Sequence, residues 1–193
     1  YTPTHTLSLH DALPISGMIE PFRLFTAAES SLVQDYNEDP AQPLNTRFLH
    51  YLIGQNQSTL IAEHLYPLDL EPTGALINGL SELLVIDQGG HFLALERAYG
   101  LRGFRVRLYQ LATGGATDTS GILTLKGNLE GVSPIRKRLL LDFADTTVEV
   151  DNLEGMALGP RLPDGSQSLV LVSDNNFDAT RNSQFILLRL VEP

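Results

Sequence analysis

Carboxylate side chains recur at matched positions of short apolar segments in this sequence. Glu82 and Glu154 each open such a segment, whereas Glu29, Glu96 and Asp174 each close one. Carboxylates that converge in a fold repel one another, so they bind a cation or share protons. Hard oxygen ligands of this kind suit Ca²⁺ or Mg²⁺, and Ca²⁺ is the expected cofactor. A bound cation would polarise an ester oxygen and activate water, which indicates hydrolysis.

Amide side chains and one arginine accompany these carboxylates and complete the expected site. The three side chains expected to carry catalysis are Glu82, Glu154 and Asp174. The three expected metal ligands are Glu29, Glu96 and Asn176. The three expected substrate contacts are Arg97, Asn152 and Asn175. In this arrangement a carboxylate serves as general base, and the guanidinium clamps a phosphate or carboxylate group.

The same residues also have structural interpretations, which stay open at the level of the sequence. Asn and Asp side chains bond their own backbone in turns, so Asp151–Gly155, Asn175 and Asn176 also suit turn chemistry. Glu96 and Arg97 are neighbours at the end of a segment and also suit a structural ion pair.

The elements that must position these side chains are mainly strands. Short apolar and β-branched runs, bounded by Gly, Asp, Asn and Pro, predict strands at Phe22–Ala28, Arg47–Ile53, Thr59–Tyr66, Leu80–Ile86, His91–Glu96, Arg105–Leu111, Arg138–Phe143, Gly155–Leu158, Ser168–Ser173 and Gln184–Val191. Helical periodicity is weak, and only Ser30–Tyr36 suits one or two helical turns, with Glu29 and Asp35 at its ends. Asp118 is expected to brace its loop.

The order of the segments indicates an internal repeat. Two stretches share the same pattern: an acidic residue at the start of a strand, a Gly-containing turn, and an apolar strand that ends in a charged residue. They are Gly79 to Gly100 and Asn152 to Phe177, and a partial third copy ends at Glu29. A repeat of about 70 residues with four short strands is typical of a propeller blade. The sequence therefore predicts an all-β fold, a partial β-propeller of about three four-stranded blades, as the C-terminal half of a closed ring. A free-standing β-sandwich is the alternative.

Composition excludes several classes of function. The 193 residues carry a net charge of −10, which argues against nucleic-acid binding, and the absence of cysteine excludes disulfides and thiolate sites. No apolar run approaches the roughly 18 residues that span a bilayer. The sequence has no G-x-S-x-G, H-E-x-x-H or P-loop motif, and His50, His64 and His91 are scattered. The basic run Arg136–Arg138 is expected to be a solvated strand edge.

The first residues differ in character from the remainder. The core of Tyr1–Ser16, TLSLHDALPI, resembles a translated sequencing adapter and lacks the basic start of a signal peptide. We therefore expect residues 1–16 to be a non-native, disordered leader, and residues 17–193 to be the C-terminal part of the propeller domain.

Several stretches resemble the phytase-like, or esterase-like, β-propeller family of bacteria. They are TAAESSLVQD at Thr26–Asp35, GLSELLVI and LALER within Gly79–Arg97, RLYQLATGGATDTSG at Arg107–Gly121, and DNLEGMALGP with LVLVSDNNF within Asp151–Phe177. The resemblance implies hydrolysis of a small phosphate or carboxylic ester by a protein that is a monomer at full length. It also implies a periplasmic or secreted location. The rival hypothesis is a non-catalytic propeller that binds a ligand and carries a structural calcium site, because one fold hosts both roles.

Overall fold

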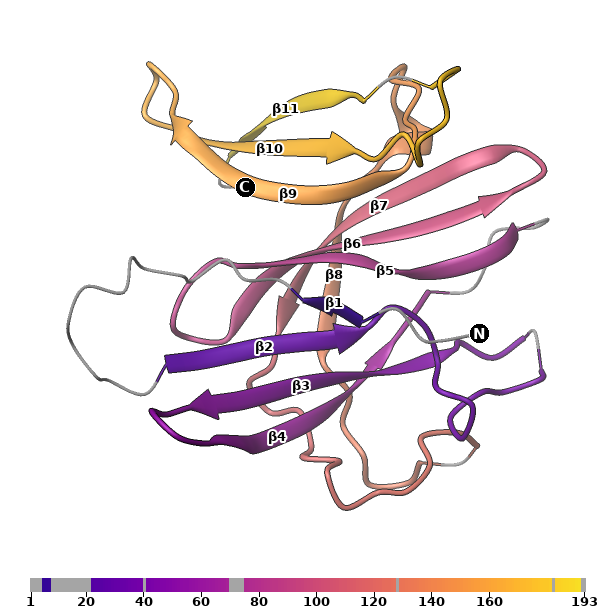
Figure 1. Ribbon diagram of the computed structural model, residues 1–193, viewed down its shortest axis with the longest axis vertical. Coiled ribbons are helices and arrows are strands. Elements are labelled where there is room, and N and C mark those ends of the chain that lie inside the picture. The colour runs from indigo at the N-terminus through magenta and orange to yellow at the C-terminus, as the bar shows by residue number, and fades with distance from the viewer. Residues whose placement is uncertain are drawn as a thin grey trace.

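Strands account for nearly all the regular structure of the chain. The computed structural model describes residues 5–7, 22–39, 41–69, 75–127, 129–181 and 183–191 (Figure 1). Within these residues the fold is all-β, with eleven strands and one short 3-10 helix, η1 (Phe143–Asp145). No helix among the described residues is long and apolar enough to cross a bilayer.

The strands form three antiparallel sheets, each built from consecutive strands of the chain. The first sheet has the order β1 (His5–Leu7), β2 (Phe22–Ala28), β3 (Asn45–Ile53), β4 (Ser58–Pro67). The second has the order β5 (Ala75–Val85), β6 (His91–Gly100), β7 (Gly103–Ala112), β8 (Arg136–Asp142). The third has the order β9 (Leu153–Arg161), β10 (Gln167–Ser173), β11 (Phe185–Leu190). The predicted all-β class and all ten predicted strands are confirmed, and β1 is an additional one.

Turn chemistry ends the strands where the sequence indicated. In the β5–β6 turn, the Oδ1 atom of Asp87 accepts the Gly89 N–H at 2.7 Å, and Gly90 adopts a left-handed φ of 85°. Gly103 does the same at the tip of the β6–β7 hairpin, with φ 87°. Glycine adopts this conformation without steric cost, so these residues allow the chain to reverse tightly.

The predicted helical turns at Ser30–Tyr36 are wrong. This segment contains bends and a turn closed by the Asp35 N–H bond to Leu32 O at 2.9 Å. The Asp35 side chain does not cap a helix but is fully buried against Arg47, with Oδ2 2.7 Å from Nε. Arg47 also bonds Glu63 at 2.6 Å, so burial of this charged group is compensated.

The loop that follows β7 is hydrogen-bonded to the first sheet near Glu63 in β4. Asp118 accepts the backbone N–H groups of Glu63 at 3.1 Å and Ser120 at 3.0 Å, which confirms it as a loop brace. Thr119 donates its N–H to Glu63 O at 2.7 Å. These bonds hold the GATDTSG stretch against β4.

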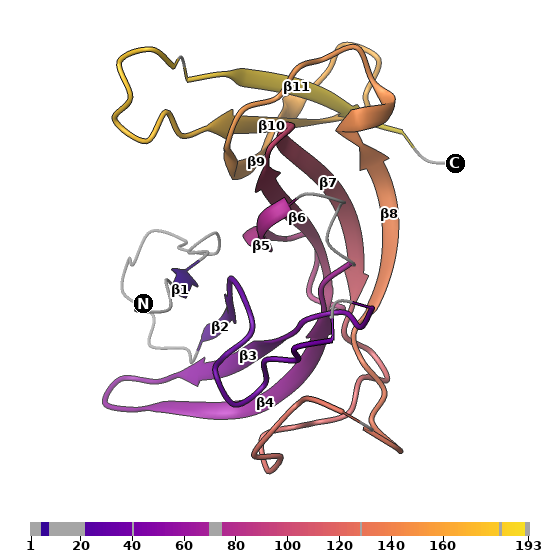
Figure 2. The ribbon, with the colours of Figure 1, turned by 90° about the vertical axis from the view of Figure 1, so that its right-hand side faces the viewer.

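Two hydrophobic cores hold the three sheets together, and the second sheet lies between the other two (Figure 2). The core shared by the first and second sheets is aromatic: the Phe92 ring lies 5.1 Å from Phe48 and 4.9 Å from Phe25. The core shared by the second and third sheets includes Leu95, Val106, Leu153, Leu169 and Leu171. The second sheet is therefore buried on both faces, and successive residues of β6 point into different cores.

The expected leader at Tyr1–Ser16 lies outside the described residues, except for His5–Leu7. The backbone of that short segment pairs antiparallel with β2, with His5 opposite Ala28.

Candidate functional site

Polar side chains from all three sheets meet at the guanidinium of Arg97, which extends from β6 toward the third sheet. Nη1 donates to Glu154 Oε1 at 3.0 Å and to Asn152 Oδ1. Nη2 donates to Glu29 Oε1 at 2.5 Å. Asn152 also donates through Nδ2 to Asn176 Oδ1, at a long 3.5 Å. We call Glu29, Arg97, Asn152, Glu154 and Asn176 the Arg97 cluster; all five were predicted as site residues.

The first sheet reaches this cluster because the chain approaches β5 very closely after β2. Leu80 N–H donates to the carbonyl of Glu29 at 2.8 Å. A Cβ atom at Gly79 would lie 2.8 Å from Glu29 Cγ and 2.9 Å from Glu29 O, distances that side chains do not tolerate. Glycine at position 79 therefore allows Glu29 to reach Arg97.

The third sheet contributes through the residues that open β9. Asn152 is fully buried, and its backbone carbonyl accepts the Asp174 N–H at 2.9 Å. Its own N–H donates to Asp151 Oδ1 at 2.8 Å. These bonds hold the Asn152 backbone in place, and the side-chain bonds to Arg97 and Asn176 orient its amide.

The Arg97 cluster combines a buried cation with accessible carboxylates. The Arg97 side chain is 11% exposed, whereas those of Glu29 and Glu154 are 28% and 35% exposed. Nε of Arg97 is buried and has no hydrogen-bond partner among the described residues. Oxygen atoms of both carboxylates can therefore meet solvent or a ligand while a fixed positive charge lies beside them.

The loop after β10 contributes Asn176 to the cluster and contains backbone strain. Asp174 accepts the Asn176 N–H, and Asn175 accepts the Phe177 N–H, both at 3.1 Å. Asn176 and Phe177 both adopt left-handed conformations, with φ of 53° and 57°. The Phe177 side chain is completely exposed. Asn175 thus forms a turn of the kind that the sequence left as an alternative, and Asp174 forms a similar turn. Strained residues such as Asn176 and Phe177 gather near functional sites.

Glu96 is not brought together with Glu29 and Asp174, because it follows the alternation of β6 and points to the opposite face from Arg97. Its side chain is 3% exposed. Its carboxylate accepts hydrogen bonds from the Tyr66 hydroxyl at 2.7 Å and from the Asp69 N–H at 3.1 Å. It also forms an ion pair with Lys137 Nζ. Glu96 therefore belongs to the interface between the first and second sheets.

Lys137 is a residue whose role the sequence analysis missed. Its side chain is 9% exposed, and its ammonium lies 4.9 Å from the centroid of the Tyr66 ring and 4.3 Å from that of Tyr109. Burial raises the pKa of both tyrosines, and the neighbouring carboxylates raise it further. The expectation of a solvated edge is wrong for Lys137 and holds for Arg136 and Arg138, which are exposed. Strand alternation is the signal that separates Lys137 from these two.

Glu82 lies in β5, at an irregularity in its pairing with β6. The residue is 8% exposed, and its Oε1 accepts the Leu83 N–H at 2.8 Å.

A metal site of three carboxylate or imidazole groups is absent from the part of the chain that the structure describes. Of the three expected ligands, Glu29 and Asn176 belong to the Arg97 cluster, whereas Glu96 faces the other core. The Arg97 guanidinium binds the oxygens of Glu29, Asn152 and Glu154, which a cation would otherwise use.

Of the comparisons with known proteins, the one with family models agrees with the family resemblance found in the sequence. No curated protein and no solved structure matches the chain. A family model described as phytase-like, with the esterase-like activity of phytase, matches residues 12–177. This match spans the residues of all three sheets that form the Arg97 cluster. The chain therefore belongs to the phytase-like family.

Proposed function

We propose that this chain is part of a hydrolase that cleaves a phosphate or carboxylic ester at the Arg97 cluster. The observation that carries the proposal is the meeting of Glu29, Arg97, Asn152 and Glu154 from three successive sheets, with both carboxylates still accessible. The family to which the chain belongs is described by esterase-like activity.

Each side chain has a chemical task in this proposal. Glu154, the more exposed carboxylate, accepts a proton from water as that water attacks the carbonyl carbon or phosphorus of the ester. The bond to the alcohol oxygen then breaks, and the protonated Glu154 returns the proton to this leaving oxygen, so that an alcohol and a free acid are released. Arg97 supplies a fixed positive charge beside the oxygen on which negative charge develops. Glu29 and Asn152 hold the guanidinium in place and so act as positioning residues.

Calcium assistance, expected from the sequence, would require a cation to compete with Arg97 for Glu29 and Glu154. The geometry therefore favours the guanidinium as the source of positive charge. If calcium takes part, hydrolysis will fall when a chelator is added and recover when calcium is restored.

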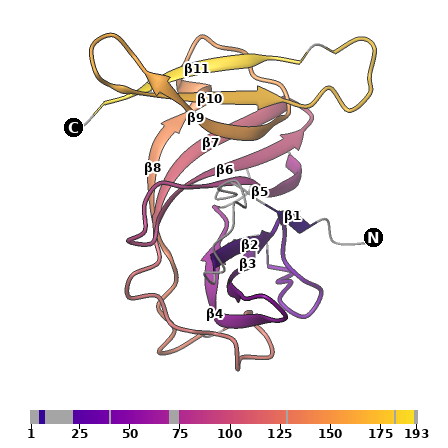
Figure 3. The same cartoon turned by 60° about the vertical axis from the view of Figure 1, so that its left-hand side comes forward.

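We further infer that the three sheets are successive blades of a β-propeller. Each sheet is a meander of consecutive strands and packs face to face on the next, as blades do. The outer face of the third sheet is apolar: Val170 and Val172 lie opposite Leu187 and Phe185, which are 63% and 76% exposed. Figure 3 shows β11 at one edge of this sheet. A further blade would cover that face.

Hydrolysis of p-nitrophenyl acetate and p-nitrophenyl phosphate tests the proposed site. We expect Glu154→Gln to lower kcat by roughly 100-fold or more, the usual contribution of a general base. Glu38→Gln is the matched control, because Glu38 is an exposed loop residue outside the cluster. Unchanged hydrolysis by a folded Glu154→Gln protein contradicts the proposal. Binding of an ester without any hydrolysis would favour the non-catalytic propeller.

A further inference from the structure

A groove beside the Arg97 cluster has the character of a ligand site. It lies between the β6–β7 hairpin and the segment that leads from η1 toward β9, and it encloses about 750 Å³. Its apolar walls include Tyr99, Phe104, Val106, Phe143 and Val150. Small-molecule sites are commonly of this size and mainly apolar, with a few polar groups that orient the ligand. We call this site the arginine–aromatic groove.

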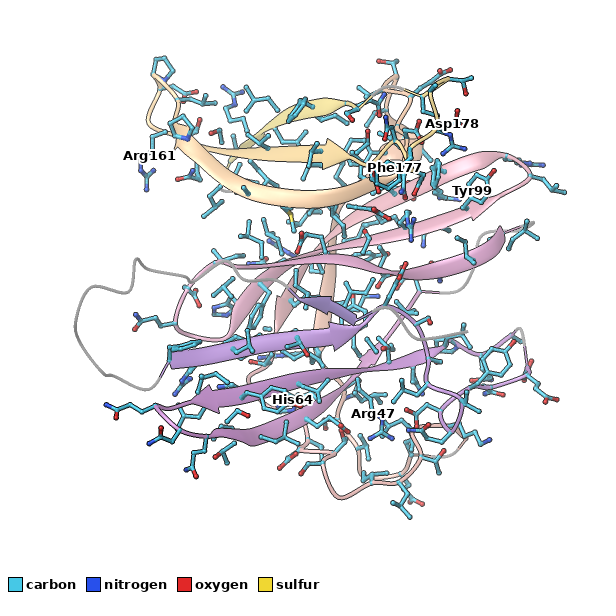
Figure 4. The ribbon with its side chains drawn as sticks, in the orientation of Figure 1. Arg47, His64, Tyr99, Arg161, Phe177 and Asp178 are labelled. Carbon is cyan, nitrogen blue, oxygen red and sulfur yellow. The ribbon has the colours of Figure 1, made fainter. Side chains whose placement is uncertain are left out.

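The groove adjoins the proposed site of hydrolysis. Val106 lines the groove and is the direct cross-strand partner of Arg97, so both side chains lie on the same face of the second sheet. On the other wall, Val150 lies two residues before Asn152. Figure 4 shows Tyr99 at the same end of the molecule as Phe177, and Arg161 at the opposite end. A ligand in the groove would thus place one end near Arg97.

An aromatic pair forms part of the groove wall. The rings of Tyr99 and Phe104 lie 4.6 Å apart with an interplanar angle of 40°. The guanidinium of Arg181 lies 5.4 Å from the centroid of the Phe104 ring, so the loop after β10 is in contact with this wall. Aromatic faces of this kind favour a planar, aromatic ligand group.

Basic residues outnumber acidic ones in the lining of the groove, although the chain as a whole is acidic. Its charged lining residues are Arg102, Arg105 and Glu149, two basic groups against one acidic group, whereas the chain has a net charge of −10. Arg105 is paired with Asp142 at 2.7 Å. Arg102 is exposed and has no ion-pair partner among the described residues. Its guanidinium is therefore available to bind an anion.

We propose that the arginine–aromatic groove binds an aromatic anion, a ring that carries a phosphate or carboxylate group. Tyr99 and Phe104 contact the ring, and Arg102 binds the anionic group. As a statement about the substrate of the Arg97 cluster, this proposal rests on the proposed function. Binding itself does not require hydrolysis and is measured separately.

Equilibrium binding of phenyl phosphate and benzoate tests the proposal, with inorganic phosphate and benzyl alcohol as the comparison ligands. We expect both aromatic anions to bind the chain at least roughly 10-fold more tightly than either comparison ligand. Arg102→Gln should weaken their binding by about 10-fold or more, because a charge-assisted hydrogen bond contributes at least that factor. Phe104→Leu should weaken the binding of benzoate and phenyl phosphate but leave the binding of inorganic phosphate unchanged.

Arg161→Gln is the matched control, because Arg161 is exposed at the far end of the third sheet. This substitution should leave binding of the aromatic anions unchanged. Equal affinity for phenyl phosphate and inorganic phosphate, or no effect of Arg102→Gln, would overturn the groove proposal. Glu154→Gln separates the two proposals: it should retain aromatic-anion binding while losing hydrolysis. Binding without hydrolysis by the unmodified chain contradicts only the proposed function, whereas hydrolysis without groove binding contradicts only this inference.

Discussion

Replacing Lys137 by methionine is the most direct way to test how the first and second sheets are joined. Methionine keeps the unbranched stem of lysine and removes the ammonium. That ammonium bonds Glu96, Asp69 Oδ1 at 2.9 Å and the carbonyl of Pro67 at 2.9 Å. The Glu96 carboxylate, only 3% exposed, would then lack its cationic partner. It would keep its bonds from Tyr66 Oη and the Asp69 N–H.

The expected loss follows from the burial of both partners. Removing one member of a buried ion pair costs about 3–5 kcal/mol, because an uncompensated charge remains in the interior. A domain has a free energy of unfolding of only about 5–15 kcal/mol, so the loss would be a large share of the total. With a urea m-value of about 2 kcal/mol/M, the midpoint of unfolding should fall by about 2 M.

Urea denaturation of four proteins provides the assay. The double variant Lys137→Met with Glu96→Gln removes both charges, so it should be more stable than Lys137→Met alone by about 1–3 kcal/mol. Arg138→Met is the control, because Arg138 is the next residue of β8 and is exposed. Among the described residues, its side chain donates only to Gln110, at 2.7 Å. Its free energy of unfolding should change by less than about 0.5 kcal/mol. The reasoning is refuted if Lys137→Met behaves like Arg138→Met, or if the double variant is no more stable than the single one.

Three further perturbations follow from single features. Burial and its bond to Asp69 raise the pKa of Tyr109 above 10.0, so the unfolded chain loses the phenolic proton at lower pH than the folded chain. The free energy of unfolding should therefore fall as pH rises above about 10. In denaturation measured at successive pH values, Tyr109→Phe should make this fall less steep. Gly79→Ala should cost about 1–3 kcal/mol in thermal unfolding, since its Cβ would meet Glu29, whereas Gly121→Ala, with open space around its Cβ, should not. Phe177→Gly should raise the free energy of unfolding by about 0.5–1 kcal/mol, because glycine adopts the left-handed φ of 57° without strain. Phe177→Ala should not raise it. A lower free energy of unfolding in the glycine variant would contradict this prediction.

The strands were predictable because their signals are local. The apolar run Ser168–Ser173 and the turn at Gly90 each define an element without reference to distant residues. The candidate site was predictable in part for the same reason: Glu29, Asn152 and Glu154 occupy matched positions at the edges of apolar runs, and the structure brings all three to Arg97.

The errors arose where a partner is determined by tertiary packing. Glu96 was grouped with Glu29 although alternation along β6 sends it to the face opposite Arg97, and its partner Lys137 is 41 residues away. Asp35 was expected at a helix end, yet it pairs with Arg47 from the neighbouring strand β3. The Glu96–Lys137 pair depends on the packing of two sheets, and the Asp35–Arg47 pair depends on how the loop after β2 folds against β3. No local pattern reports either arrangement.

The dependence of the Arg97 cluster on three consecutive sheets has a consequence for synthesis on the ribosome. Each sheet consists of adjacent strands, so each can form soon after its own residues emerge. Glu29 and Arg97 would therefore be in place before Asn152 and Glu154 have been translated. The guanidinium gains its last two acceptors only when β9 docks on the second sheet. Arrival of the third sheet is thus the event that converts an incomplete, inactive nascent chain into one that can carry out the proposed chemistry.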